Sequence, residues 1–140
     1  MRGGAGAGGR RGVGLSYRGF ESTEMKAPDI QTAVPVRRYV IGDYSAVLLH
    51  QISSRDKAPY YFILALVPFG GSSPTLYIAA QKADETGDGP DTIIRVVAEG
   101  GERAFGPDDR WRDLDMFAED ALQMAVKVLH LAGEEVRRLL

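Results

Sequence analysis

Histidine is the side chain best suited to proton transfer near neutral pH, and this chain has two, His50 and His130. The absence of cysteine excludes thiolate catalysis, disulfides and cysteine-ligated zinc. A zinc site needs at least three protein ligands, and a serine nucleophile needs a histidine oriented by a carboxylate. Two isolated histidines supply neither set. We therefore predict one half-buried and one exposed histidine, no catalytic residue, no metal and no cofactor.

Carboxylates are concentrated in residues 108–120. Paired carboxylates perform acid–base catalysis when their surroundings separate their pKa values. Here they precede and begin a predicted helix, where acidic side chains cap backbone amides and complement the helix dipole. Arg110 and Arg112 lie among them as expected ion-pair partners. We interpret the group as a solvated helix start; its members are Asp108, Asp109, Asp113, Asp115, Glu119 and Asp120.

Two glycine-containing patterns resemble ligand-binding motifs. Residues 4–9 satisfy G-x-G-x-x-G, but a dinucleotide site requires a strand before the glycines and a helix after them. Residues 84–89 match the first half of a calcium-binding loop, yet its twelfth position is Arg95 instead of glutamate. We therefore predict a solvated hairpin loop at residues 83–91.

Tyrosine and arginine side chains lie on or beside the predicted strands. Such side chains stack nucleobases on an open sheet, and they are also enriched in protein–protein interfaces. After residue 24 the chain carries 13 basic and 17 acidic side chains, a net charge of −4, which disfavours nucleic acid. The candidate interaction face comprises Arg37, Arg38, Tyr39, Tyr44, Tyr60, Tyr61, Tyr77 and Arg95.

Five segments have the composition and alternation of strands, and a sixth is expected after Gly100-Gly101. The run from residue 60 to 67 is apolar throughout, which indicates a central strand covered on both faces, at least in part. The connections are short, which favours an antiparallel meander because parallel strands need long crossovers. The segments are residues 36–41, 44–53, 60–67, 75–82, 92–99 and 102–105.

The apolar period changes to that of a helix after Phe105. Apolar residues from Leu114 to Ala132 recur at intervals of three and four, with Asp113 as the expected N-cap. Trp111 is expected to pack the helix start against the sheet edge. Gly133 is expected to interrupt or end the helix and to leave residues 134–140 as a frayed extension. The sequence leaves open which sheet face the helix covers.

Residues 1–27 are rich in glycine and arginine and are predicted to form a disordered N-terminal extension, with residues 28–140 as a single domain. Met25 is a plausible true start, and an RNA-contacting arm is the alternative interpretation of the residues before it. No apolar run approaches the roughly 20 residues that span a bilayer, and no signal-peptide core is visible. We predict a cytoplasmic protein without a membrane partner.

These patterns predict an α+β fold: a five- to six-stranded antiparallel β-meander with one long C-terminal α-helix packed across one face. The uncovered face must be exposed or covered by a partner. The leading hypothesis is therefore a non-enzymatic interaction module that forms a homodimer through its sheet or binds another protein. The alternative is single-stranded nucleic-acid binding. A small-ligand carrier or enzyme ranks third, and a pocket between helix and sheet lined by His50 or Tyr44 would favour it.

Overall fold

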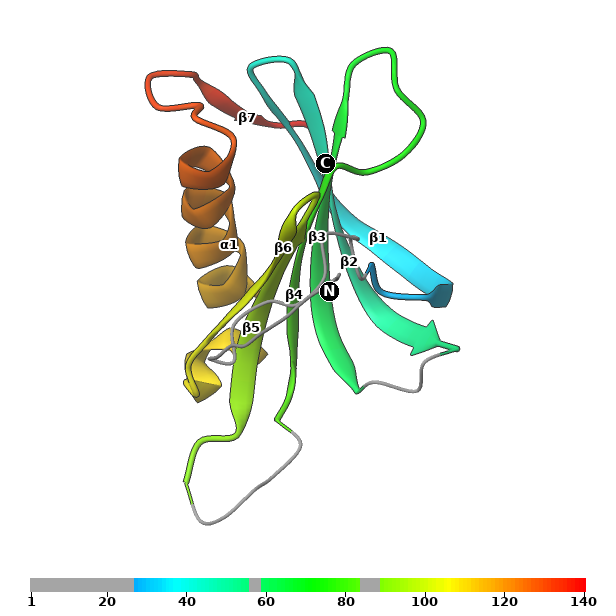
Figure 1. Cartoon of the computed structure of the whole chain (residues 1–140), viewed down its shortest axis with the longest axis vertical. Helices are drawn as coiled ribbons and strands as arrows, with labels where there is room; N and C mark the ends of the chain where they lie inside the picture. Colours follow the sequence, from blue (N-terminus) through cyan, green and yellow to red (C-terminus); the bar gives the residue numbers. More distant parts are fainter. Residues whose placement is uncertain (1–26, 56–58, 84–88) are drawn as a thin grey trace, which may run out of the picture.

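The computed structural model describes residues 27–55, 59–83 and 89–140, and within them the chain forms one antiparallel sheet with one α-helix beside it (Figure 1). The predicted α+β class is therefore confirmed. The predictions made for residues 1–26 and for the middle of the loop at 83–91 lie outside the described residues. The α-helix has 15 residues, and no helix in the described ranges is long and apolar enough to cross a membrane.

The sheet has seven strands, where five or six were expected. Its order is β6-β5-β4-β3-β2-β1-β7, so the first six strands form the predicted meander and the last strand returns beside the first. The elements in chain order are β1 (Ile30–Ile41), β2 (Tyr44–Ser54), β3 (Tyr60–Pro68), β4 (Leu76–Lys82), β5 (Thr92–Ala98), β6 (Gly101–Phe105), the 3-10 helix η1 (Asp109–Arg112), α1 (Leu114–Val128) and β7 (Val136–Arg138).

The additional strand, β7, replaces the frayed helical extension that the sequence predicted for residues 134–140. It pairs antiparallel with the end of β1, and Arg137 lies opposite Val40. The backbone N–H of Leu139 donates to the carbonyl of Arg38 at 2.7 Å. This pairing gives hydrogen-bond partners to backbone N–H and C=O groups of the last residues of β1, which would be exposed at an unpaired edge. The prediction failed because three residues of strand carry too little pattern to recognise.

The helix ends at Val128, five residues before the glycine that was expected to end it. His130 takes the left-handed conformation, with φ of +56°, directly after the C-cap residue Leu129. The N–H of Leu131 then donates to the carbonyl of Val126 at 2.8 Å, and the N–H of His130 reaches Lys127 at 3.4 Å. These two bonds form a Schellman motif, whose left-handed position is usually glycine.

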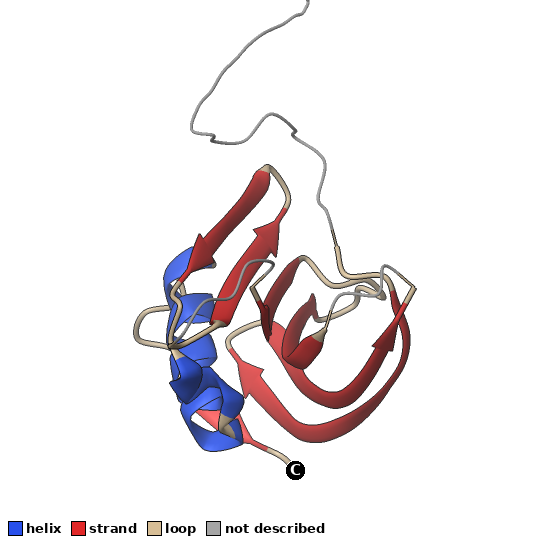
Figure 2. Ribbon diagram, turned by 90° about the horizontal axis from the view of Figure 1, so that it is seen from below, coloured by secondary structure: helices blue, strands red, loops and turns tan. Residues whose placement is uncertain are grey.

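Strand β1 begins six residues before the predicted start and contains Pro35. Proline has no N–H to donate, so it is tolerated where one side of a strand is unpaired. That condition holds here, because β7 pairs only with residues 39–41. The register between β1 and β2 shifts at three places in residues 30–37. Such bulges bend a strand pair, and Figure 2 shows β1 and β2 curling round beside the rest of the sheet.

The main core lies between the sheet and α1. The helix buries Phe117, Ala118, Ala121 and Ala125 and contacts β3 and β4, the central strands. Phe117 is fully buried, and its ring stacks on that of Phe62 with 5.4 Å between centroids. The helix therefore lies on the sheet face that carries Phe62, but it contacts mainly β3 and β4 and does not pack across the whole face as predicted.

The opposite sheet face is partly covered by the chain itself. Tyr60, Ile63 and Ala79 form a second buried cluster, against which Ile30 of β1 and Ile52 of β2 pack. Both of these partners come from the curled ends of the first two strands (Figure 2). Apolar residues at the centre of this face are therefore buried within a single chain.

Candidate functional site

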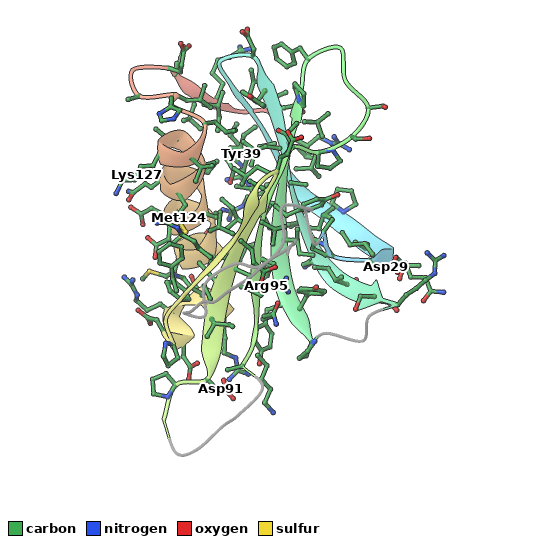
Figure 3. The ribbon with its side chains drawn as sticks, in the orientation of Figure 1. Asp29, Tyr39, Asp91, Arg95, Met124 and Lys127 are labelled. Atoms are coloured by element: carbon green, nitrogen blue, oxygen red, sulfur yellow. The ribbon has the colours of Figure 1, made fainter. Side chains whose placement is uncertain are left out.

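A groove of about 520 Å³ lies between the β5–β6 edge of the sheet and the C-terminal half of α1. Its volume falls within the usual range for ligand sites of proteins. Figure 3 shows Met124 and Lys127 on α1, which forms one wall. The lining residues are Val96, Ala98, Gly100, Gly101, Glu102, Arg103, Phe105, Met124, Lys127 and Val128.

The groove exists because the helix covers the centre of the sheet and the side chains beneath its far end are small. Contacts of α1 are mainly with β3 and β4 and with η1, so β6 extends past the helix. Ala98 and Gly101 pair across the β5–β6 turn and both line the groove, so small residues form this part of its surface. Gly100 has φ of +102°, a conformation that favours glycine at this turn.

Strand β6 forms one end of the sheet, and in the described part of the chain it pairs only with β5. Its outer backbone groups are therefore available to another strand. Arg103 lies opposite Val96 and Phe105 opposite Ile94. Because Val96 and Ile94 belong to the core under α1, Arg103 and Phe105 also face the helix side of the sheet.

The opposite face of the same edge carries a closed polar cluster. Arg95 donates to Glu102 at 3.0 Å and to Gln81 at 3.0 Å. Burial alone lowers the pKa of Arg95, but the bond to Glu102 and the nearby Tyr60 outweigh it and raise the pKa above its ordinary value. This guanidinium is thus held as a cation and already paired.

The eight residues of the predicted interaction face divide between the two sides of the sheet. On the helix side, the tyrosines belong to the main core or pack against it, whereas Arg37 lies beside the start of α1. The other four lie on the opposite side by strand alternation or in the second cluster. The helix-side set is Arg37, Tyr39, Tyr44 and Tyr61; the opposite set is Arg38, Tyr60, Tyr77 and Arg95.

Contacts within the chain occupy most of these side chains. The Arg37 guanidinium forms an ion pair with Asp115 at the start of α1, and this contact raises the pKa of Arg37. Arg112 lies over the ring of Tyr61, 5.1 Å from its centroid. Tyr77 is partly buried, which raises the pKa of its hydroxyl. The structure therefore does not bring the eight residues together as one open surface.

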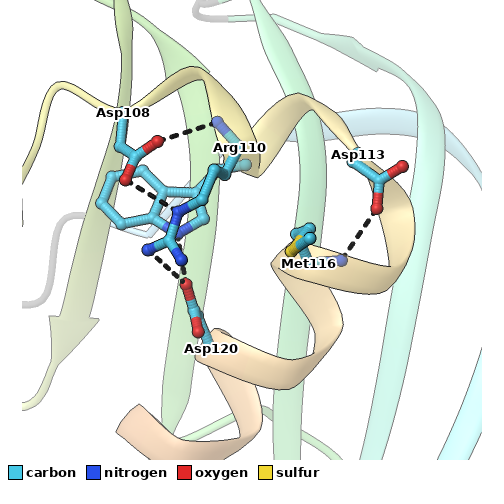
Figure 4. Close-up of polar contacts among 6 residues, drawn as sticks. Asp108, Arg110, Asp113, Met116 and Asp120 are labelled. Atoms are coloured by element: carbon cyan, nitrogen blue, oxygen red, sulfur yellow. Dashed lines mark hydrogen bonds and ion pairs between the residues drawn. The ribbon is translucent and has the colours of Figure 1, made fainter.

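The acidic segment forms local hydrogen bonds that shape the helix start, as Figure 4 shows. Asp113 caps α1, as predicted, by accepting from the N–H of Met116 at 3.0 Å. Asp120 accepts from the indole N–H of Trp111 at 2.8 Å and from Arg110 at 3.3 Å. These bonds hold the buried indole between the helix start and strand β5, and they leave no free carboxylate pair among these residues.

Two further aspartates fix η1 and join it to the sheet. Asp108 accepts from the backbone N–H of Arg110 at 2.9 Å, which lowers the pKa of Asp108. Asp109 accepts from the N–H groups of Asp91 and Thr92 at 3.0 and 3.1 Å, and the amide of Asp91 is the main cause of its lowered pKa. Asp108 therefore caps η1, whereas Asp109 binds η1 to the start of β5.

The histidines do not form a site. His50 lies in β2 opposite Val34, whereas His130 lies in the turn after α1. No group of three or more potential metal-ligating side chains occurs in the described residues. A pocket between helix and sheet does exist, but it contains neither His50 nor Tyr44, the residues that were expected to line one.

The groove was not predicted from the sequence, because it forms where small residues leave space between the sheet and the helix. The available signals were Gly100-Gly101 before the last short strand and the apolar residues Phe105 and Val128, which are 41% and 40% exposed. Neither signal identifies a site before the helix and the edge strand are placed together.

Comparisons with family models, curated proteins and solved structures found no match to this chain.

Proposed function

We propose that this chain is a non-enzymatic interaction module that binds an extended segment of another protein at the β6 edge. The observation that supports this proposal is the combination of an edge strand with a groove directly beside it. An extended segment adds to an exposed edge through main-chain hydrogen bonds, and alternate side chains enter neighbouring pockets. The groove beside Phe105 and Val128 provides such a pocket.

The geometry of β6 suits this mode of binding. Gly101, Arg103 and Phe105 alternate along the strand and share the helix side. A strand added beside β6 would direct every second side chain toward α1, because successive residues of a strand point to opposite faces. Those side chains would meet Met124 and Val128 of the groove wall.

Self-association through the sheet is the other form of the interaction hypothesis. The sequence favoured it because one face of the sheet was expected to need a partner. On that face, the curled ends of β1 and β2 already bury Ile63 and Ala79. Light scattering of the full chain tests self-association directly. A monomer would leave binding to a different protein as the form of the hypothesis to pursue.

The proposal is tested by selecting twelve-residue peptides from a random displayed library on the full chain. Binding of the best peptide is then measured by fluorescence polarisation to two matched variants. Val128→Trp fills the mouth of the groove and should weaken binding by about tenfold or more. Met116→Trp adds the same side chain at a residue that is 45% exposed on the same helix, outside the groove lining, and should leave binding unchanged.

Two results would contradict the proposal. One is a selection that yields no peptide above background. The other is equal binding of the selected peptide by the Val128→Trp and Met116→Trp variants, which would place the contact outside the groove.

A further inference from the structure

Each wall of the groove carries one exposed cation. Arg103 projects from β6 and Lys127 from α1, and both line the groove. In the part of the chain that the structure describes, neither forms an ion pair. Glu102 also lines the groove, but its carboxylate is already bound to Arg95 at 3.0 Å. Among the described lining residues, the groove therefore has two cations without an ion-pair partner and one carboxylate that is already paired.

The rest of the groove is mostly apolar. Val96, Ala98 and Met124 contribute side chains to it, and Phe105 and Val128 remain about two-fifths exposed. A strand rises about 3.3 Å per residue, so side chains on one face recur roughly every 6.6 Å. An acidic residue with apolar residues two positions before and after it would thus present one carboxylate and two apolar groups to the groove.

We infer that the β6–α1 groove selects an extended protein segment in which an acidic side chain alternates with apolar ones. The carboxylate lies between Arg103 and Lys127, and the flanking apolar side chains lie against Phe105 and Val128. This inference rests on the function proposed above, because it names the chemistry of the segment that the edge strand would bind.

Charge also argues against a second copy of this chain as the occupant. In a two-fold antiparallel pairing of β6 with itself, opposed side chains must share a face, so the pairing centres on Glu102, Arg103 or Ala104. The first two choices place like charges directly opposite each other, which destabilises a strand pair. The third leaves only residues 103–105 to pair, with Arg103 opposite Phe105. A segment with its own acidic residue avoids all three arrangements.

The test repeats the peptide selection on the full chain and on its Arg103→Glu variant. Peptides selected by the unmodified chain should share an Asp or Glu flanked by apolar residues two positions away. Replacing that acid by glutamine in the best peptide, or Arg103 by glutamate in the protein, should weaken binding roughly three- to tenfold. Lys82→Glu reverses an exposed charge outside the groove and should have no effect.

The outcomes separate this inference from the proposed function. If selected peptides lose affinity with Val128→Trp but show no preference for acids, the inference is wrong and the strand-addition proposal stands. If no selected peptide is sensitive to Val128→Trp, the proposed function itself fails. If peptides chosen on the Arg103→Glu variant carry Lys or Arg at the corresponding position, the charge assignment is supported. Tighter binding of dodecanoate than of any peptide would make the groove a small-ligand site and overturn the inference.

Discussion

Replacing Phe117 by alanine should remove the main anchor of α1, and the structure allows the size of the effect to be estimated. The side chain is fully buried and stacks on Phe62 with 5.4 Å between centroids. Truncation of a buried phenylalanine to alanine costs about 3–5 kcal/mol, since it removes both apolar burial and packing contacts. Stacking contributes roughly 0.5–1.5 kcal/mol beyond burial. We therefore expect the substitution to lower the free energy of unfolding by about 4–5 kcal/mol.

The assay is denaturant unfolding followed by the fluorescence of Trp111. This indole is the only one in the chain and is buried beside the helix start, so its signal reports on the packing of η1 and α1. Met116→Ala is the matched control because residue 116 is adjacent and 45% exposed, and it should change the unfolding free energy by less than about 0.5 kcal/mol. Phe117→Leu retains most of the volume and gives a measurable value if Phe117→Ala does not fold.

A loss below about 1.5 kcal/mol for Phe117→Ala would refute this account of the core. Equal losses for Phe117→Ala and Met116→Ala would also refute it, because they would show that the exposed and buried faces of α1 are not as described.

Two further changes have expected outcomes. His130→Gly should raise the unfolding free energy by about 1 kcal/mol in the same denaturant assay, because a non-glycine residue at φ of +56° is strained; an unchanged or lower value would contradict the Schellman assignment. The lowered pKa of Asp109 means that its ionised form stabilises the fold above its ordinary value of 3.8 and that this contribution is lost as the pH falls through the lower folded value. Asp109→Asn should therefore make stability less dependent on pH below about pH 4, and an identical acid profile would contradict that assignment.

The helix and its start were predictable because several independent signals coincide there. The apolar repeat from Leu114 onward, a capping residue at Asp113 and the nearby tryptophan all indicate the same element, and the structure confirms each. The predicted strands β2 to β5 are present for the same reason, since their apolar runs are long and bounded by turn residues.

The end of the helix could not be predicted from glycine positions. His130 adopts the left-handed conformation that normally identifies a glycine C-cap, whereas Gly133 lies in the following turn. The pairing of β7 with β1 then depends on where the helix releases the chain. A three-residue strand has too few side chains to show a recognisable sequence pattern. Its position follows from the edge of β1 that is available for pairing.

The candidate site was the least predictable feature, because it depends on the relation between elements that are separate in the sequence. Arg103 and Lys127 belong to no recognisable sequence motif. They share a groove because α1 contacts mainly β3 and β4 and leaves space beside β6. The aromatic and basic residues that the sequence favoured divide instead between two faces. Strand alternation assigns residues to opposite faces, but a bulge such as that between Tyr60 and Phe62 changes the assignment locally.

Amide hydrogen exchange of β6 with and without a selected peptide tests the central proposal most directly. If a segment adds to the edge strand, its main chain bonds to the outward backbone groups of residues 101–105, and those amides should exchange more slowly in the complex. Amides of β7, at the opposite edge of the sheet, serve as the internal reference and should not change. Protection confined to β7 or to the face that carries Tyr77, with β6 unchanged, would contradict the proposal.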